Sequence, residues 1–281
     1  MLPTFMVGWS ALVILPLLIM AGYSFLQVRS YRVVYQPSFA TWISLVESGR
    51  WIAIVRTLRV AFTITVIEFL LAFPFAIWLA KICRSKPLKA LIVTLLTIPF
   101  FLDASSRMIV WRAILGNAGV VNTLLLHVGV IDQPIKWLLF SEFAVHFGMI
   151  GSYFPTMLFP IYLVLTLIDD EYFEASADLG ASPLQTLVRI TLPLALPGIV
   201  AGFVFTLVPL MAAFVEPQML GGGFVNLLGF SVDSALRELK YPTAAALSTV
   251  VVLMLAMLLL LLVAITRRRM DIASVFQAIR R

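Results

Sequence analysis

Long apolar stretches, separated by short polar connections, dominate the pattern along the chain. Six windows are long enough to cross about 30 Å of hydrocarbon, which takes roughly 20 helical residues at about 1.5 Å each. Backbone groups in lipid must pair within their own segment, so each window is predicted to be a helix. The windows are Phe5–Leu26, Val60–Ala80, Ala90–Leu115, Phe143–Ile168, Leu192–Val215 and Ala244–Ile265. The pattern therefore predicts an all-α membrane protein with six transmembrane helices, which form a single domain over residues 1–281.

The composition agrees with a chain that is built for lipid. Of its 281 residues, 62% are hydrophobic and only 12% are charged, whereas about a quarter of the residues in globular proteins are charged. The net charge of +6 is compatible with nucleic-acid binding. We interpret the basic residues instead as anchors at a membrane surface and expect lipid, not nucleic acid, as the partner. Because Cys83 is the only cysteine, the chain can form no internal disulfide.

The distribution of Lys and Arg predicts the orientation. The connection Lys81–Lys89, "KICRSKPLK", holds four basic residues in nine, and the tail after Ile265 contains Arg267–Arg269. With six spans, both lie on the same side as residues 169–191. Cytoplasmic loops are enriched in Lys and Arg, so we expect this side and both termini to be cytoplasmic, although several arginines lie on the other side.

Residues 169–191, between the fourth and fifth windows, are polar enough to lie outside the membrane. An aspartate at position 169 or 170 can cap a first helix, and Gly180 fits the position just after its end. Ser182 and Pro183 are typical of the cap and first residue of a second helix. The segment is therefore predicted to be a helical hairpin on the cytoplasmic side. A capped connecting loop explains the same pattern equally well.

The stretch "EASADLGASPLQTLVRITLP" (Glu174–Pro193) resembles the cytoplasmic signature of ABC importer permeases. In that signature Glu-Ala-Ala, three residues, Gly, nine residues, Ile, one residue and Leu-Pro follow in order. The resemblance implies that the hairpin is a coupling helix that docks into a groove of an ATPase subunit. The matching residues, with Ser176 in place of the second alanine, are Glu174, Ala175, Ser176, Gly180, Ile190, Leu192 and Pro193.

Further stretches, among them "FPFAIWLAK" (Phe73–Lys81) and "YPTAAALS" (Tyr241–Ser248), resemble the spermidine/putrescine-type branch of these permeases. The resemblance implies a multi-pass protein of the bacterial inner membrane that imports a polyamine or related cationic solute. It also implies three kinds of partner: two ATPase subunits, a second, non-identical six-helix permease subunit, and a periplasmic or extracytoplasmic solute-binding protein.

The chain itself shows no sign of enzymatic chemistry. It contains no G-x-x-x-x-G-K-[ST] phosphate loop, and no metal-ligand spacing surrounds His127 or His146. We expect no cofactor on this chain, with ATP and Mg²⁺ bound by the partner ATPase. No internal repeat is visible, whereas autonomous transporters often contain two related halves. An autonomous secondary transporter or a channel is the alternative in a different class.

Polar side chains inside the windows are candidates for the solute pathway, because a charge at mid-bilayer costs about 2.5–3.5 kcal/mol. Asp103 and Arg107 are four residues apart and are expected to pair on one helix face, and Pro99 can bend or break this span. Glu216 is interpreted first as an interfacial acid, and Glu68 as a hydrogen-bond partner between helices. If these residues instead line a pathway, acids and aromatic rings suit amine cations, while the arginines leave an anionic or zwitterionic solute open. The candidate pathway residues are Glu68, Asp103, Arg107, Trp111 and Glu216.

Overall fold

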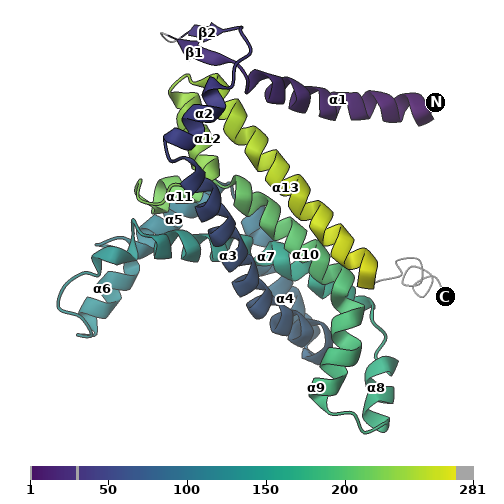
Figure 1. The fold of residues 1–281 in the computed structure, drawn as a ribbon. Coiled ribbons are helices and arrows are strands. Elements are labelled where there is room, and N and C mark those ends of the chain that lie inside the picture. Colours follow the sequence, from purple (N-terminus) through teal and green to yellow (C-terminus); the bar gives the residue numbers. More distant parts are fainter. Residues whose placement is uncertain (1, 30–31, 270–281) are drawn as a thin grey trace. The chain divides into compact units, whose positions relative to one another are not determined.

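The computed structural model describes residues 2–29 and 32–269 and is mainly helical (Figure 1). Packing divides the chain into two compact units. One holds the residues up to 55 and those from 228 onward, and the other holds residues 56–227. The expectation of a single permease domain over residues 1–281 stays a prediction.

The first unit contains two long helices and a short pair of antiparallel strands. Helices α1, α2 and α12 pack against α13, as does strand β1. Strands β1 and β2 are antiparallel, with Gln27 opposite Val34. The elements are α1 (Leu2–Tyr23), β1 (Gln27–Arg29), β2 (Arg32–Val34), α2 (Ala40–Glu47), α12 (Leu228–Arg237) and α13 (Tyr241–Arg269).

The second unit carries the candidate functional residues. Helix α3 runs into it and continues as the π-helical turn η1, and α10 packs along α7. Its elements are α3 (Trp51–Ile77), η1 (Trp78–Ile82), α4 (Lys86–Thr97), the 3-10 turn η2 (Ile98–Phe101), α5 (Ala104–Leu115), α6 (Val120–His127), the 3-10 turn η3 (Lys136–Leu138), α7 (Glu142–Leu167), α8 (Glu171–Asp178), α9 (Pro183–Thr186), the π-helical turn η4 (Leu187–Thr191), α10 (Leu192–Ala212) and α11 (Val215–Leu220).

Five segments of the described chain are long and apolar enough to cross a membrane, so six spans remain a prediction. Helix α1 covers most of the first predicted window, but within the described chain its apolar stretch, Ser10–Tyr23, is shorter than these segments. The five segments are Trp51–Ile82, Ala104–His127, Glu142–Leu167, Pro183–Ala212 and Tyr241–Ala264.

The predicted third span, Ala90–Leu115, is wrong as a continuous helix, although a break near Pro99 was foreseen. Helix α4 ends at Thr97, η2 follows, and Leu102 is extended before α5 begins. Pro99 has no N–H for the helical ladder. Asp103 then caps α5 by accepting hydrogen bonds from the Ser105 and Ser106 amides at 2.7 and 3.3 Å. The local backbone chemistry of a proline followed by a cap therefore overrides the apolar periodicity.

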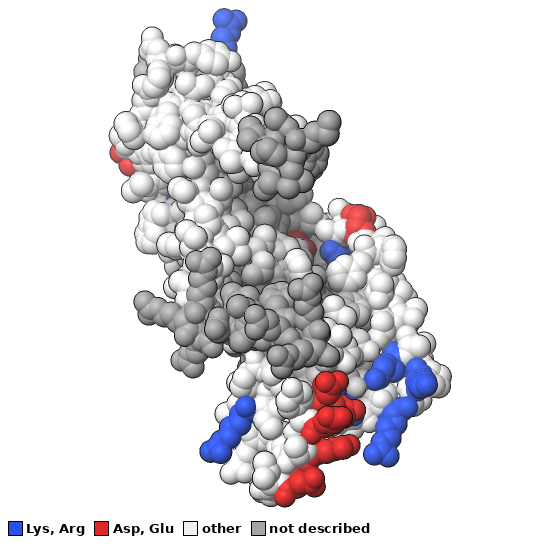
Figure 2. All heavy atoms as spheres, turned by 90° about the vertical axis from the view of Figure 1, so that its right-hand side faces the viewer, with Lys and Arg blue, Asp and Glu red and all other residues white. Residues whose placement is uncertain are grey.

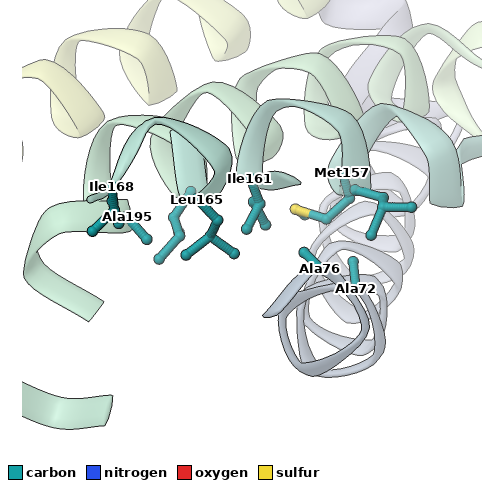
Figure 3. Packing of buried hydrophobic residues seen from close by; sticks show 9 residues of the cluster. Ala72, Ala76, Met157, Ile161, Leu165, Ile168 and Ala195 are labelled. Carbon is teal, nitrogen blue, oxygen red and sulfur yellow. The ribbon is translucent and has the colours of Figure 1, made fainter. Parts of the chain in front are cut away.

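A core of α3, α7 and α10 side chains holds the second unit together (Figure 3). Small residues permit close packing of α10 on α7, as is common between membrane helices. A Cβ atom added to Gly198 would lie 2.7 Å from the Pro160 carbonyl oxygen, and one added to Gly202 would lie 2.9 Å from that of Met157. The two helix backbones therefore touch where these glycines lie, four residues apart.

Gly198→Val is expected to lower the stability of the folded protein by about 1–3 kcal/mol, because overpacking forces the backbones apart. Thermal unfolding of the purified protein measures the effect. Ala201→Val is the control for added bulk on the same helix, since Ala201 is half-buried where Gly198 is buried, and both line an apolar groove of about 720 Å³. Equal melting temperatures for wild type and Gly198→Val would contradict the close α7–α10 contact.

Candidate coupling hairpin and intramembrane polar cluster

Helix α8 and the turn after it form the first half of the predicted hairpin. Gly180 follows the C-cap residue Leu179 and has φ +74°. Its amide donates to the Ala177 carbonyl at 2.9 Å, and the Ala181 amide donates to the Ser176 carbonyl at 3.1 Å. These two bonds make a Schellman motif, in which glycine is favoured because an L side chain is strained at positive φ. The predicted position of Gly180 is confirmed.

The second half begins at the predicted cap Ser182, which forms a capping box that the sequence analysis did not predict. The Ser182 hydroxyl accepts from the Gln185 amide, the Gln185 side chain accepts from the Ser182 amide at 2.8 Å, and Pro183 is the first helical residue. The hydroxyls of Ser176 and Thr186 lie 2.7 Å apart and connect the two helices. Ser176 is the residue that departs from the family signature. Its partner Thr186 is not among the predicted site residues.

Asp170 occupies the N-cap position of α8, one of the two positions expected, but its side chain makes no capping hydrogen bond within the described part of the chain. Its Oδ1 atom instead accepts from Lys81 Nζ at 2.6 Å. The carboxylate does not bind the first amides of α8 because it binds a lysine that only tertiary packing brings near. Neither Lys81 nor its contacts were singled out from the sequence.

The hairpin presents an apolar and acidic surface. Leu179 and Leu184 are 88% and 68% exposed, and Figure 2 shows acidic side chains gathered at the lower end of the molecule, with basic residues on either side. Of the signature residues, Ser176 is buried and Ile190, in η4, is half-buried. Those exposed are Glu174, Ala175, Gly180, Leu192 and Pro193. The turn and the start of α10 are thus accessible to a partner.

The second candidate feature is a buried polar cluster within residues 56–227. Glu216, on α11, is 1% exposed, and its Oε1 atom accepts a hydrogen bond from the Tyr153 hydroxyl of α7 at 3.1 Å. The interpretation of Glu216 as an interfacial acid is therefore wrong. The short helix α11 packs against α5 and α7, and this packing removes the carboxylate from the surface.

Glu68, on α3, is 0% exposed and lies within electrostatic range of Tyr153. Neither of its carboxylate oxygens has a hydrogen-bond partner among the residues that the structure describes. The predicted hydrogen bond between helices is therefore not made there. A buried carboxyl group without a partner is costly, so Glu68 calls for a functional explanation.

Arg107 and Asp103 do not form the predicted ion pair in the described chain. Asp103 is exposed and caps α5, while Arg107 Nη1 donates to the Pro99 carbonyl at 3.3 Å. The Nε atom of Arg107 and the Oγ atom of Ser152 are buried with no hydrogen-bond partner among the described residues. Both residues line a cavity of about 230 Å³, as do Tyr153 and Thr156. This cavity offers unused hydrogen-bond donors beside the break in the third predicted span.

Trp111 has a packing role in this structure. Its ring meets Phe147 edge-on with centroids 5.0 Å apart, and it covers Gly151, where an added Cβ would lie 2.6 Å from the indole. Trp111 thus joins α5 to α7 next to the polar cluster.

Comparison with known proteins decides the family. Residues 72–271 match the family model of the binding-protein-dependent transport system inner membrane component. The spermidine/putrescine transport system permease protein PotB of Escherichia coli (strain K12) is 32% identical over 247 residues, which cover 86% of this chain and 88% of the relative. The chain belongs to this family of transport permeases. It is the permease component of an ABC importer and a multi-pass protein of the inner membrane.

Two further likenesses extend the comparison. The putative 2-aminoethylphosphonate transport system permease protein PhnU of Salmonella typhimurium is 28% identical to this permease over 74% of the chain and 73% of the relative. Among solved structures, a chain of the bacterial alginate ABC transporter, in complex with an alginate pentasaccharide-bound periplasmic protein, is similar with a TM-score of 0.76. It is 20% identical, and the match covers 95% of this chain and 92% of that one. This likeness supports the fold.

Proposed function

We propose that this permease moves a small cationic amine of the polyamine class, driven by separate ATPase subunits that bind ATP and Mg²⁺ and dock on the hairpin of residues 169–191. The signature residues, from Glu174 to Pro193, then form the coupling surface. ATP binding closes the ATPases, the hairpin passes this movement to the helices, and the pathway alternates between its two sides. The exposed turn around Gly180 and the exposed Leu179 and Leu184 support docking, because neighbouring exposed apolar side chains are typical of protein–protein interaction sites.

The assembly proposed around this chain follows from its family. Two ATPase subunits and a second, non-identical six-helix permease complete the transporter, and a solute-binding protein delivers solute from outside. Both termini and the hairpin are then cytoplasmic, in agreement with the basic connection Lys81–Lys89 and the enrichment of cytoplasmic loops in Lys and Arg.

The observation that carries the choice of solute is the pair of buried carboxyl groups, Glu68 and Glu216, near Tyr153. Arg107 also lies within electrostatic range of this tyrosine, so the cluster contains two acids and one guanidinium. Counted as formal charges, the cluster has one acid more than it has basic groups, and an ammonium group can pair with the extra carboxyl group when solute passes. PotB, which is named for spermidine and putrescine, is a relative over most of the chain. A role in the pathway is likewise proposed for Asp103 and Trp111, which flank this cluster.

A zwitterionic solute is the second candidate. The unused Arg107 Nε and Ser152 Oγ atoms suit a carboxylate or phosphonate oxygen, while the acids suit an amine. A relative that is named for 2-aminoethylphosphonate belongs to the same family.

Affinity purification of the chain from its native membrane is expected to recover an ATPase and a second permease. In proteoliposomes with the solute-binding protein, spermidine is expected to raise ATP turnover more than 2-aminoethylphosphonate does. Stimulation by the phosphonate alone would favour the second candidate. Solute transport by the chain reconstituted without partners would refute the proposed assembly.

A further inference from the structure

Lys81 lies where α3 meets the start of the hairpin. It belongs to η1, the π-helical turn that continues α3. Its ammonium group donates to the Ile168 carbonyl, just past the end of α7, and to Asp170 Oδ1 at 2.6 Å. The same nitrogen lies 5.2 Å from the centroid of the Phe173 ring on α8. One side chain thus contacts three residues around the start of the hairpin, about 90 positions away in sequence.

We infer that Lys81 is a positioning residue that ties the coupling hairpin to α3, so that a displacement of the hairpin moves this helix. The inference rests on the proposed function, in which an ATPase moves the hairpin. α3 is the helix that carries Glu68, 13 residues before Lys81, or roughly 20 Å along a continuous helix. Lys81 therefore connects the docking surface with the polar cluster through α3 and its π-helical continuation η1.

Burial indicates which contacts of Lys81 matter. Its side chain is 15% exposed, whereas that of Asp170 is 76% exposed, and an ion pair with a solvated partner contributes little. The Ile168 carbonyl lies at the negative end of the α7 dipole, which attracts a cation, and the Phe173 ring attracts it through its π face. Both interactions are shielded from water with the lysine, so they hold the start of the hairpin against η1.

The backbone on both sides of the hairpin supports a joint at this place. Two π-helical turns adjoin the hairpin: η1 contacts its start through Lys81, and η4 forms its last five residues. Such turns interrupt regular helices and are frequent at functional sites. No continuous helix joins the hairpin to α3, so its movement can reach α3 only through side-chain contacts, and Lys81 supplies such a contact.

Lys81→Met in the complete transporter tests the inference. Methionine keeps the length and apolar stem but removes the three donors. We expect unchanged recovery of the ATPase and unchanged basal ATP hydrolysis, with solute-driven uptake per complex reduced about tenfold, within the usual range of coupling free energies. Lys81→Arg, which keeps the charge, is expected to restore part of the uptake. Lys86→Met, the same change at an exposed position of the same connection, is the control and should behave as wild type.

A distance measurement separates this inference from the proposed function. Spin labels at Arg84 and Glu171, in a Cys83→Ser background that removes the only native thiol, report the spacing between the α3 end and the hairpin. We expect a narrow distribution in wild type that broadens in Lys81→Met.

An unchanged distribution, or normal uptake per folded complex in Lys81→Met, would overturn the role of Lys81. A loss of thermal stability alone would not support it, because that loss is also expected if Lys81 only caps α7. Failure of the wild-type chain to recover any ATPase would count against the proposed function instead. In that case the distance measurement still decides the tie between hairpin and α3.

Discussion

Gly180→Trp is expected to abolish solute-stimulated ATP turnover while the chain still inserts into the membrane and folds. Among the described residues no atom beyond the chain neighbours lies within 4 Å of a Cβ added at this glycine, so the turn is open where the new side chain begins. The cost inside the permease is limited to the left-handed backbone, about 1–2 kcal/mol. The larger effect falls on the partner, because the indole projects from the turn beside the exposed Leu179, where the ATPase is proposed to dock.

Gly180→Asn is the matched control, because asparagine tolerates positive φ better than other residues and adds little bulk. Its ATP turnover is expected to stay close to that of wild type. Recovery of the ATPase with each variant shows whether docking or a later step is lost. Normal stimulated turnover in Gly180→Trp would remove the support for this turn as the coupling surface.

Replacing the buried acids is expected to separate transport from stability. Glu68→Met exchanges a carboxyl group that has no hydrogen-bond partner in the described chain for an apolar side chain. The complex should stay as stable or gain about 1 kcal/mol, because an unsatisfied buried polar group is removed. Uptake of labelled spermidine per folded complex should fall at least about tenfold, since the variant loses the buried carboxyl group that is proposed to pair with the amine.

Glu216→Gln makes the same test with the hydrogen bond preserved, because the amide oxygen can still accept from Tyr153. Its melting temperature should stay close to that of wild type while uptake falls. Glu47→Gln, an acid at the exposed end of α2, is the control for loss of one charge. Unchanged spermidine uptake in both buried-site variants would discard the pathway role of these acids.

Local rules explain which predictions about the hairpin were confirmed. A glycine at the end of a helix and a Ser-Pro pair at the start of the next one act through their own backbones, so Gly180, Ser182 and Pro183 could be placed without knowing the fold. The break after Thr97 was foreseen for the same reason, since Pro99 lacks an amide hydrogen wherever it lies.

Predictions about side-chain partners failed for two reasons: a nearer backbone donor competed in one case, and a donor far away in sequence in the other. Asp103 lies one helical turn from Arg107, yet its carboxylate is occupied by the first amides of α5. Asp170 was a candidate cap, but Lys81, 89 residues earlier, takes its oxygen. A carboxylate binds the donors that reach it, and the sequence shows only those that lie nearby along the chain.

The sequence by itself determined the membrane-spanning helical class, the permease family and the hairpin, because hydrophobic runs, caps and the spacing of the signature act over at most some twenty neighbouring residues. Only the tertiary structure decided that Glu68 and Glu216 are buried near one tyrosine, that α10 touches α7 at Gly198 and Gly202, and that Lys81 holds the hairpin. Burial and partnership arise from the packing of α3, α5, α7 and α11, and a side chain's spacing along its own helix does not specify which other helix covers it.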